Sequence, residues 1–176
     1  VKIIRGIIVV LSKLPLKFHY FMGDILSWFM KNVVRYRSTV VYVNLSRSFP
    51  EKSAREIKKI YDAFYKHMGE IVAEAIWFGG STYRRLYESG IVTVVNAKGV
   101  SEIFENTPSM TVLSTHCGNW ELLGGLLGYR TDDGETLRMP ESSISVVYKK
   151  LSNEVSDRVF ALNRVAPLEE VGTECE

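Results

Sequence analysis

Cysteine and histidine are scarce in this sequence of 176 residues. The chain has two cysteines, Cys117 and Cys175, and three histidines, His19, His67 and His116. The cysteines do not form the spaced pairs of a disulfide framework, so nothing indicates an oxidising compartment. The histidines have no second ligand at a zinc-like spacing, so we expect neither a metal site nor a cofactor.

A strong excess of charge of one sign is also missing. Lys and Arg together number 22 and Asp and Glu number 20, which gives a formal net charge of +2. A nucleic-acid binder usually presents a concentrated basic face, so nucleic acid is not an expected partner. Hydrophobic residues make up 46% of the chain, which is typical of a globular protein, and the length suits one domain better than two.

Residues 1–34 are rich in apolar and aromatic side chains but contain no long uncharged run. Lysines and arginines interrupt them, so no stretch reaches the ~18 to 20 residues that a clear membrane-spanning helix needs. No small-residue cleavage site indicates a secretory signal. A basic, aromatic and apolar segment suits a membrane interface, and we expect residues 1–34 to form a membrane-associated helical segment. A spanning helix and a core helix of a soluble domain remain alternatives.

After this segment, the hydrophobic pattern predicts helices that alternate with strands. A long helix is expected over residues 50–78, where Ser53 and Glu56 have capping-box spacing and Gly79-Gly80 ends the pattern. Its apolar residues at helical spacing are expected to pack in the core: Ile57, Ile60, Tyr61, Phe64, Met68, Ile71, Val72, Ala75 and Ile76. Further strands are expected over 91–95, 110–115 and 144–148, and helices over 99–105, 119–128 and 153–163. This alternation predicts an α/β fold with a mostly parallel sheet flanked by helices.

The segment with the clearest chemistry is Ser114-Thr115-His116-Cys117-Gly118-Asn119-Trp120-Glu121. It follows a predicted strand and opens a predicted helix, and sites in open α/β sheets form at the carboxyl ends of strands. Five residues of one straight helix turn ~500°, which would point the side chains of His116 and Glu121 ~140° apart. The two can therefore meet only if His116 precedes the helix, with Gly118 as a backbone hinge.

A histidine held by a carboxylate can act as a general base. The carboxylate fixes the ring tautomer and stabilises the imidazolium, so the other ring nitrogen can take a proton from a hydroxyl. The helix start at Asn119 and Trp120 favours developing negative charge. A buried, hydrogen-bonded strand-end histidine is the alternative interpretation of His116. Cys117 is interpreted as a small packing residue rather than a nucleophile, because adjacent side chains at a strand end usually point apart.

The stretch His116–Glu121 resembles the HxGNWE signature of the bacterial lipid A biosynthesis acyltransferases, the lauroyl and myristoyl transferase family. The resemblance covers roughly residues 13–168 of the sequence. It includes Leu14-Pro15, Tyr36-Arg37, Asn44-Leu45-Ser46-Arg47-Ser48-Phe49-Pro50-Glu51, Val147-Tyr148-Lys149, Asn153, Asp157 and Arg164.

The resemblance implies a glycerol-phosphate-acyltransferase-like α/β fold. Residues 35–176 would be the N-terminal part of the acyltransferase domain, and the sequence would be incomplete at its C-terminus. His116 would be the general base and Glu121 its orienting partner, and the substrate contacts would be Asn119, Trp120, Tyr148 and Arg164.

The same resemblance implies an O-acyltransferase that uses an acyl thioester of acyl carrier protein or CoA. The acceptor would be a hydroxyl of a lipid A precursor or a related glycolipid, at the cytoplasmic face of the bacterial inner membrane. A hydrolase that uses the same His116–Glu121 pair and an inactive membrane-associated fragment remain the alternatives.

Overall fold

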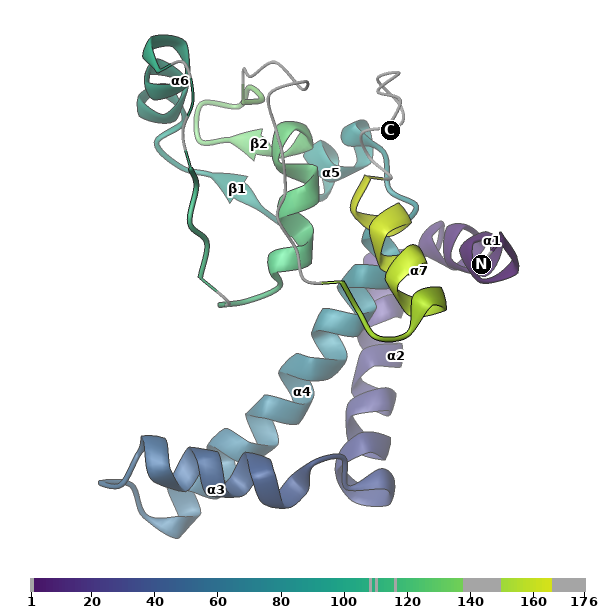
Figure 1. The fold of residues 1–176 in the computed structure, drawn as a ribbon, viewed down its shortest axis with the longest axis vertical. Helices are drawn as coiled ribbons and strands as arrows, with labels where there is room; N and C mark the ends of the chain where they lie inside the picture. The colour runs from purple at the N-terminus through teal and green to yellow at the C-terminus, as the bar shows by residue number, and fades with distance from the viewer. Residues whose placement is uncertain (1, 108, 110, 116, 138–149, 166–176) are drawn as a thin grey trace. The chain divides into compact units, whose positions relative to one another are not determined.

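Helices make up most of the described chain (Figure 1). The structure is a computed structural model that describes residues 2–107, 109, 111–115, 117–137 and 150–165, with side chains as far as Asn163. The α-helices are α1 (Lys2–Ser12), α2 (Leu16–Phe29), α3 (Ser38–Ser48), α4 (Ala54–Phe78), α5 (Tyr83–Ser89), α6 (Ala97–Asn106) and α7 (Glu154–Val165). A π-helical turn, η1 (Met30–Val34), continues α2, and a 3₁₀-helix, η2 (Trp120–Gly128), precedes the second strand.

Strand structure in the described part of the chain is limited to one short parallel pair. Strand β1 (Thr93–Val94) pairs with β2 (Arg130–Thr131), with Thr93 opposite Arg130 and Val94 opposite Thr131. The predicted α/β fold, with a mostly parallel sheet of glycerol-phosphate-acyltransferase type, is therefore wrong. Over the residues that the structure describes, the fold is mostly helical, with a two-stranded sheet in place of the expected larger one.

The predicted strand over residues 110–115 accounts for part of this error. Residues 111–115 adopt neither helix nor strand, and the side chains of Val112 and Leu113 are 71% and 91% exposed. An apolar, β-branched run forms a strand only where a neighbour takes up its hydrogen bonds and a second layer covers it. Among the described residues this segment has neither. The predicted strand over residues 144–148 lies outside the described residues.

The helix predictions are confirmed. Helices α4, α6, η2 and α7 cover the ranges expected to be helical, although α4 begins at Ala54. Its capping box forms as predicted, since the Glu56 carboxylate accepts hydrogen bonds from the backbone N–H of Ser53 at 2.9 Å and from its hydroxyl at 2.7 Å. These bonds hold the pKa of the Glu56 carboxyl below its usual value.

The chain divides into two compact units, Leu14–Glu74 and the remainder, which comprises residues 1–13 and 75–176. In the first unit, α2 crosses α4 through glycines. A Cβ atom added to Gly23 would lie 2.7 Å from the carbonyl oxygen of Gly69 and 3.2 Å from the Cβ atom of Ala73. A Cβ atom added to Gly69 would clash with the Gly23 carbonyl. The two backbones are therefore as close as residues without side chains allow.

This crossing explains which residues of α4 are buried. The prediction of a packing stripe is confirmed at Ile57, which is 3% exposed, but is wrong at Phe64 and Val72, which are exposed. The buried side chains in this helix include Tyr65 and Ala73. Toward α2, the contact face of α4 is formed by Gly69 and Ala73, whereas Tyr65, Trp77 and Phe78 are its large buried side chains.

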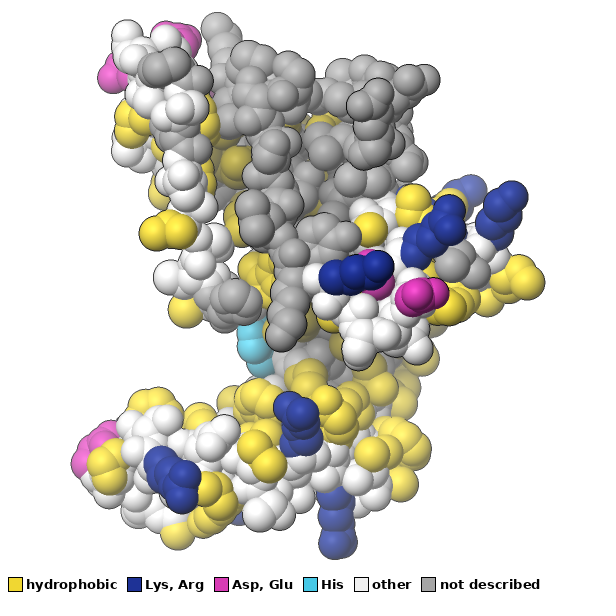
Figure 2. All heavy atoms as spheres, viewed as in Figure 1, with side chains coloured by type: hydrophobic (Ala, Val, Ile, Leu, Met, Phe, Trp, Pro, Cys, Tyr) yellow, Lys and Arg dark blue, Asp and Glu magenta, His cyan; other side chains and the backbone are white. Residues whose placement is uncertain are grey.

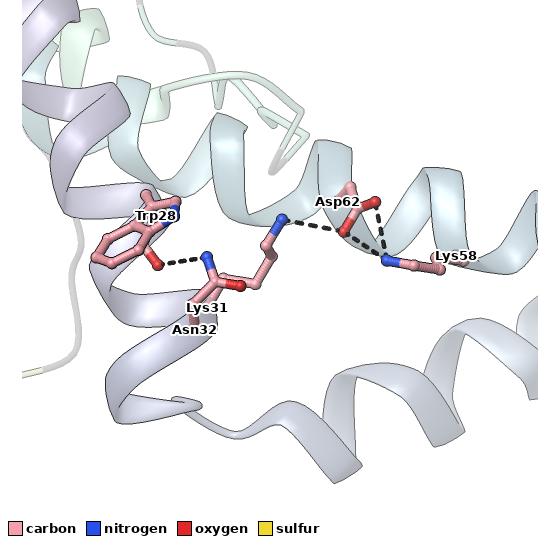
Figure 3. Close-up of polar contacts among 5 residues, drawn as sticks. All are labelled: Trp28, Lys31, Asn32, Lys58 and Asp62. Atoms are coloured by element: carbon pink, nitrogen blue, oxygen red, sulfur yellow. Dashed lines mark hydrogen bonds and ion pairs between the residues drawn. The ribbon is translucent and has the colours of Figure 1, made fainter.

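An ion-pair cluster ties η1 to α4 within the same unit (Figure 3). The ammonium groups of Lys31 and Lys58 each lie 3.2 Å from a carboxylate oxygen of Asp62. Burial raises the pKa of the Asp62 carboxyl, but the hydrogen bonds from Lys58 and Lys31 outweigh it, so the net pKa is lowered. The amide of Asn32 also donates to the Trp28 carbonyl at 2.8 Å, which supports the last turn of α2.

Gly69→Ala is expected to destabilise the protein by about 1–3 kcal/mol, because the added methyl group overpacks the α2–α4 crossing. Gly6→Ala is the matched control, since Gly6 lies inside α1 and an added Cβ atom would meet nothing within 4 Å. That control should be neutral or stabilising by up to about 1 kcal/mol, the gain in helix propensity. Denaturant unfolding of the two variants measures both effects, and equal stabilisation would contradict the close crossing.

Candidate active site

The segment that carries the predicted signature turns sharply at Gly118. Its φ angle is +70°, a left-handed conformation that glycine adopts without strain. The preceding residue, Cys117, is exposed. The predicted hinge at Gly118 is thus confirmed, and the chain bends at Cys117 and Gly118 immediately before the helix that carries Glu121.

Asn119 caps this helix. Its backbone is extended, and its side-chain oxygen accepts a hydrogen bond from the backbone N–H of Glu121 at 3.3 Å. Its carbonyl oxygen accepts from the N–H of Leu122 at 3.2 Å. Glu121 therefore lies in the first turn of η2, which is the position that the spacing argument requires.

Helix η2 is held firmly against its surroundings. Leu122 is buried, and its carbonyl accepts a hydrogen bond at 2.7 Å from the hydroxyl of buried Tyr129. A Cβ atom added to Gly125 would lie 2.6 Å from Leu86 Cδ1 and 2.9 Å from Phe78. This tight fit holds η2 in place and therefore fixes the backbone position of the partly buried Glu121 in its first turn.

The other predicted site residues are not brought together by the described structure. His116 and Tyr148 lie outside the described residues. The backbone of Arg164 belongs to α7, but its side chain lies outside the described part. Asn119 and Trp120 lie at the start of η2 as predicted. The pairing of His116 with Glu121 and the substrate contacts therefore stay predictions.

A polar junction that sequence reasoning missed holds α7, the helix that carries Arg164. The Arg5 guanidinium donates to the side-chain oxygen of Asn163 at 3.0 Å and also to the carbonyl of Gly79. The amide of Asn163, a buried side chain, donates to the Ala75 carbonyl at 3.1 Å. One residue of α1 thereby joins the end of α4 to α7. The available signal was a single arginine within the apolar block of α1.

A second arginine supports the same junction from α5. The Arg85 guanidinium donates to the carbonyl of Ser12 at 2.5 Å and lies 5.1 Å from the centre of the Trp77 ring. Burial lowers the pKa of Arg85. Ser12 is fully buried, and a Cβ atom added to Gly80 would clash with its hydroxyl. The end of α1 is thus fitted closely against the corner between α4 and α5.

The hollow next to α6 and β2 does not coincide with the predicted site. It has a volume of about 300 Å³ and is lined by Ala97, Lys98, Ser101, Glu102, Glu105, Thr131, Asp133, Glu135 and Thr136. None of the predicted site residues is among them. Across the described ranges, no cluster of three or more histidine, cysteine or acidic residues could hold a metal ion.

Helices α1 and α2 both turn their large apolar side chains outward. Exposed side chains on α1 are Ile3, Ile4, Ile7, Val10 and Leu11, and those on α2 are Phe18, Phe21, Met22, Ile25, Trp28 and Phe29. The inner faces hold small or polar residues, namely Arg5 and Ser12 in α1 and Gly23 in α2. Among the helices that the structure describes, none combines the length and hydrophobicity needed to cross a membrane.

A family model described as bacterial lipid A biosynthesis acyltransferase matches residues 2–166. Because this match covers nearly the whole sequence, it defines the class of protein as an acyltransferase. The chain belongs to the bacterial lipid A biosynthesis acyltransferase family, which confirms the resemblance carried by His116–Glu121. Comparisons with curated proteins and with solved structures find no match.

Proposed function

We propose that the protein is an O-acyltransferase that moves a fatty acyl chain from an acyl thioester to a hydroxyl of a lipid A precursor or a related glycolipid. The donor is acyl carrier protein or CoA carrying the acyl chain. Family membership carries this proposal. The turn at Gly118 and the cap at Asn119 support it locally, because they put Glu121 at a helix start directly after the segment of His116.

The proposed reaction needs no covalent intermediate with the protein. His116 takes the proton of the acceptor hydroxyl, and the oxygen attacks the thioester carbonyl while Glu121 stabilises the imidazolium. Negative charge then develops on the carbonyl oxygen, and the positive end of the η2 dipole, with Arg164, stabilises it. As the carbon–sulfur bond breaks, the imidazolium returns its proton to the thiolate. The products are the acyl ester and the free thiol.

We further propose that the reaction takes place at the cytoplasmic face of the inner membrane, which residues 1–34 contact. The support is the outward apolar face of α2 combined with the small Gly23 on its inner face. In water, burial of large apolar side chains drives packing, so a helix normally turns Phe, Ile and Trp inward. Small residues at the helix contact and large apolar residues outside are typical of helices whose outer surface meets acyl chains.

An assay with an acyl thioester, with and without the glycolipid acceptor, tests the proposed function. If the protein transfers acyl chains, thiol release should depend on the acceptor. Each thiol released should then be matched by one acylated acceptor molecule. Thiol release that is equal without acceptor, with free fatty acid as the product, would instead identify a hydrolase. No release under either condition would contradict an active enzyme.

A further inference from the structure

Residues 25–50, which include the end of α2, η1 and α3, carry basic residues but no acidic ones. Between Asp24 and Glu51 the sequence contains Lys31, Arg35, Arg37 and Arg47 and neither aspartate nor glutamate. Lys31 forms an ion pair with Asp62, which it shares with Lys58. None of the three arginines forms an ion pair with a described acidic residue. This part of the chain therefore presents uncompensated positive charge.

Two of these arginines stand in an unusual backbone conformation. Arg35 and Arg37 have φ angles of 53° and 49°, in the left-handed region that residues with side chains rarely adopt. Tyr36 lies between them, and a hydrogen bond fixes its backbone. The hydroxyl of Tyr65, a fully buried side chain, donates to the Tyr36 carbonyl at 2.6 Å. The corner thus keeps both arginines at a defined, exposed position.

Helix α3, which begins directly after this corner, has no buried residue. Val40 and Val43 are 53% and 37% exposed and share one face, on which Arg47 also lies by its spacing. Tyr42 is exposed as well and packs edge-on against Tyr61 of α4. Figure 2 shows hydrophobic and basic side chains next to each other over α3. Helix α3 thus adds exposed valine side chains and the charge of Arg47 to the surface that begins at Arg35 and Arg37.

We propose that α3 and the Arg35–Arg37 corner form a headgroup-level contact that binds the phosphates of anionic phospholipids. Charge complementarity supports this ligand, since the arginines form no ion pair with a described acidic residue. One guanidinium group can also donate two parallel hydrogen bonds to the oxygens of one phosphate. The valines of α3 would reach the boundary between headgroups and acyl chains. The inference rests on the proposed work at a membrane surface and adds a lipid preference to it, through residues beyond 1–34.

Binding of the full-length protein to vesicles tests the contact without measuring acyl transfer. The variant is Arg35→Asn with Arg37→Asn, because asparagine tolerates the left-handed conformation and carries no charge. On vesicles of phosphatidylcholine with phosphatidylglycerol, this variant should bind roughly 10- to 30-fold more weakly than the native protein at low salt. On vesicles of phosphatidylcholine alone, the two should bind equally, and high salt should remove the difference.

The matched control is Arg55→Asn with Lys59→Asn, which removes two exposed charges from α4 in the same unit. It should lower binding to the anionic vesicles less than twofold. Equal losses in control and variant, or an equal loss on both vesicle types, would overturn the phosphate contact while leaving the membrane proposal intact. If the native protein bound neither vesicle type, both the contact and the membrane part of the proposed function would be refuted.

Discussion

His116→Ala should lower the rate of acyl transfer by roughly 10²- to 10⁴-fold in the full-length protein, the usual contribution of a general base. The acceptor hydroxyl would then have no positioned group to take its proton. Glu121→Gln should cost less, because the amide can still accept a hydrogen bond but lacks the charge that stabilises the imidazolium. Rates with saturating thioester and acceptor measure both effects.

Cys117→Ala is the matched control for this pair, because Cys117 is adjacent to His116 and exposed. The proposed reaction forms no acyl-enzyme, so this variant should retain most of its activity. Loss of activity in Cys117→Ala, with an acyl group found on Cys117 by mass spectrometry of the native protein, would replace the general-base mechanism with a thiol nucleophile. The order of the three effects is thus more informative than any one of them.

Phe21→Asp with Ile25→Asp should strongly weaken membrane binding. Both side chains lie on the outer face of α2, where they are 60% and 47% exposed. Each apolar side chain that enters the hydrocarbon contributes about 1.5–3 kcal/mol, so losing two should lower the partition coefficient by roughly 10²- to 10⁴-fold. Flotation with lipid vesicles measures the partition directly.

The control for this experiment is Val95→Asp with Ile103→Asp. These two side chains are 71% and 54% exposed but belong to the loop before α6 and to α6 itself. The control variant has the same added charge and a similar loss of apolar surface, yet it should float like the native protein. Equal losses in both double variants would show that binding follows overall hydrophobicity rather than the outer face of α2.

The features that the sequence predicts best are those determined by interactions between residues close together in the chain. The capping box of Ser53 and Glu56 spans one helical turn and forms as expected. The hinge at Gly118 and the helix start at Asn119 are equally local, because a left-handed φ angle and a side-chain cap involve only neighbouring backbone. The hinge at Gly118 and the helix start at Asn119 also support the proposed active site.

Features decided by distant partners could not be predicted in the same way. The strand pattern over 110–115 needs a neighbouring strand that the described chain does not supply. The face of α4 that packs was mispredicted because Gly23 of another helix, rather than the apolar periodicity of α4, selects Gly69 and Ala73. The junction of Arg5 with Asn163 joins residues 158 positions apart, and neither residue alone indicates the other.

Mass spectrometry of lipids from bacterial cells tests the central claim most directly, namely that this family member acylates a lipid A precursor through His116. Cells without the full-length protein should accumulate a precursor that lacks one acyl chain. The native protein should restore that chain, Cys117→Ala should restore it too, and His116→Ala should not. An unchanged lipid profile in the cells without the protein, or full restoration by His116→Ala, would contradict the account.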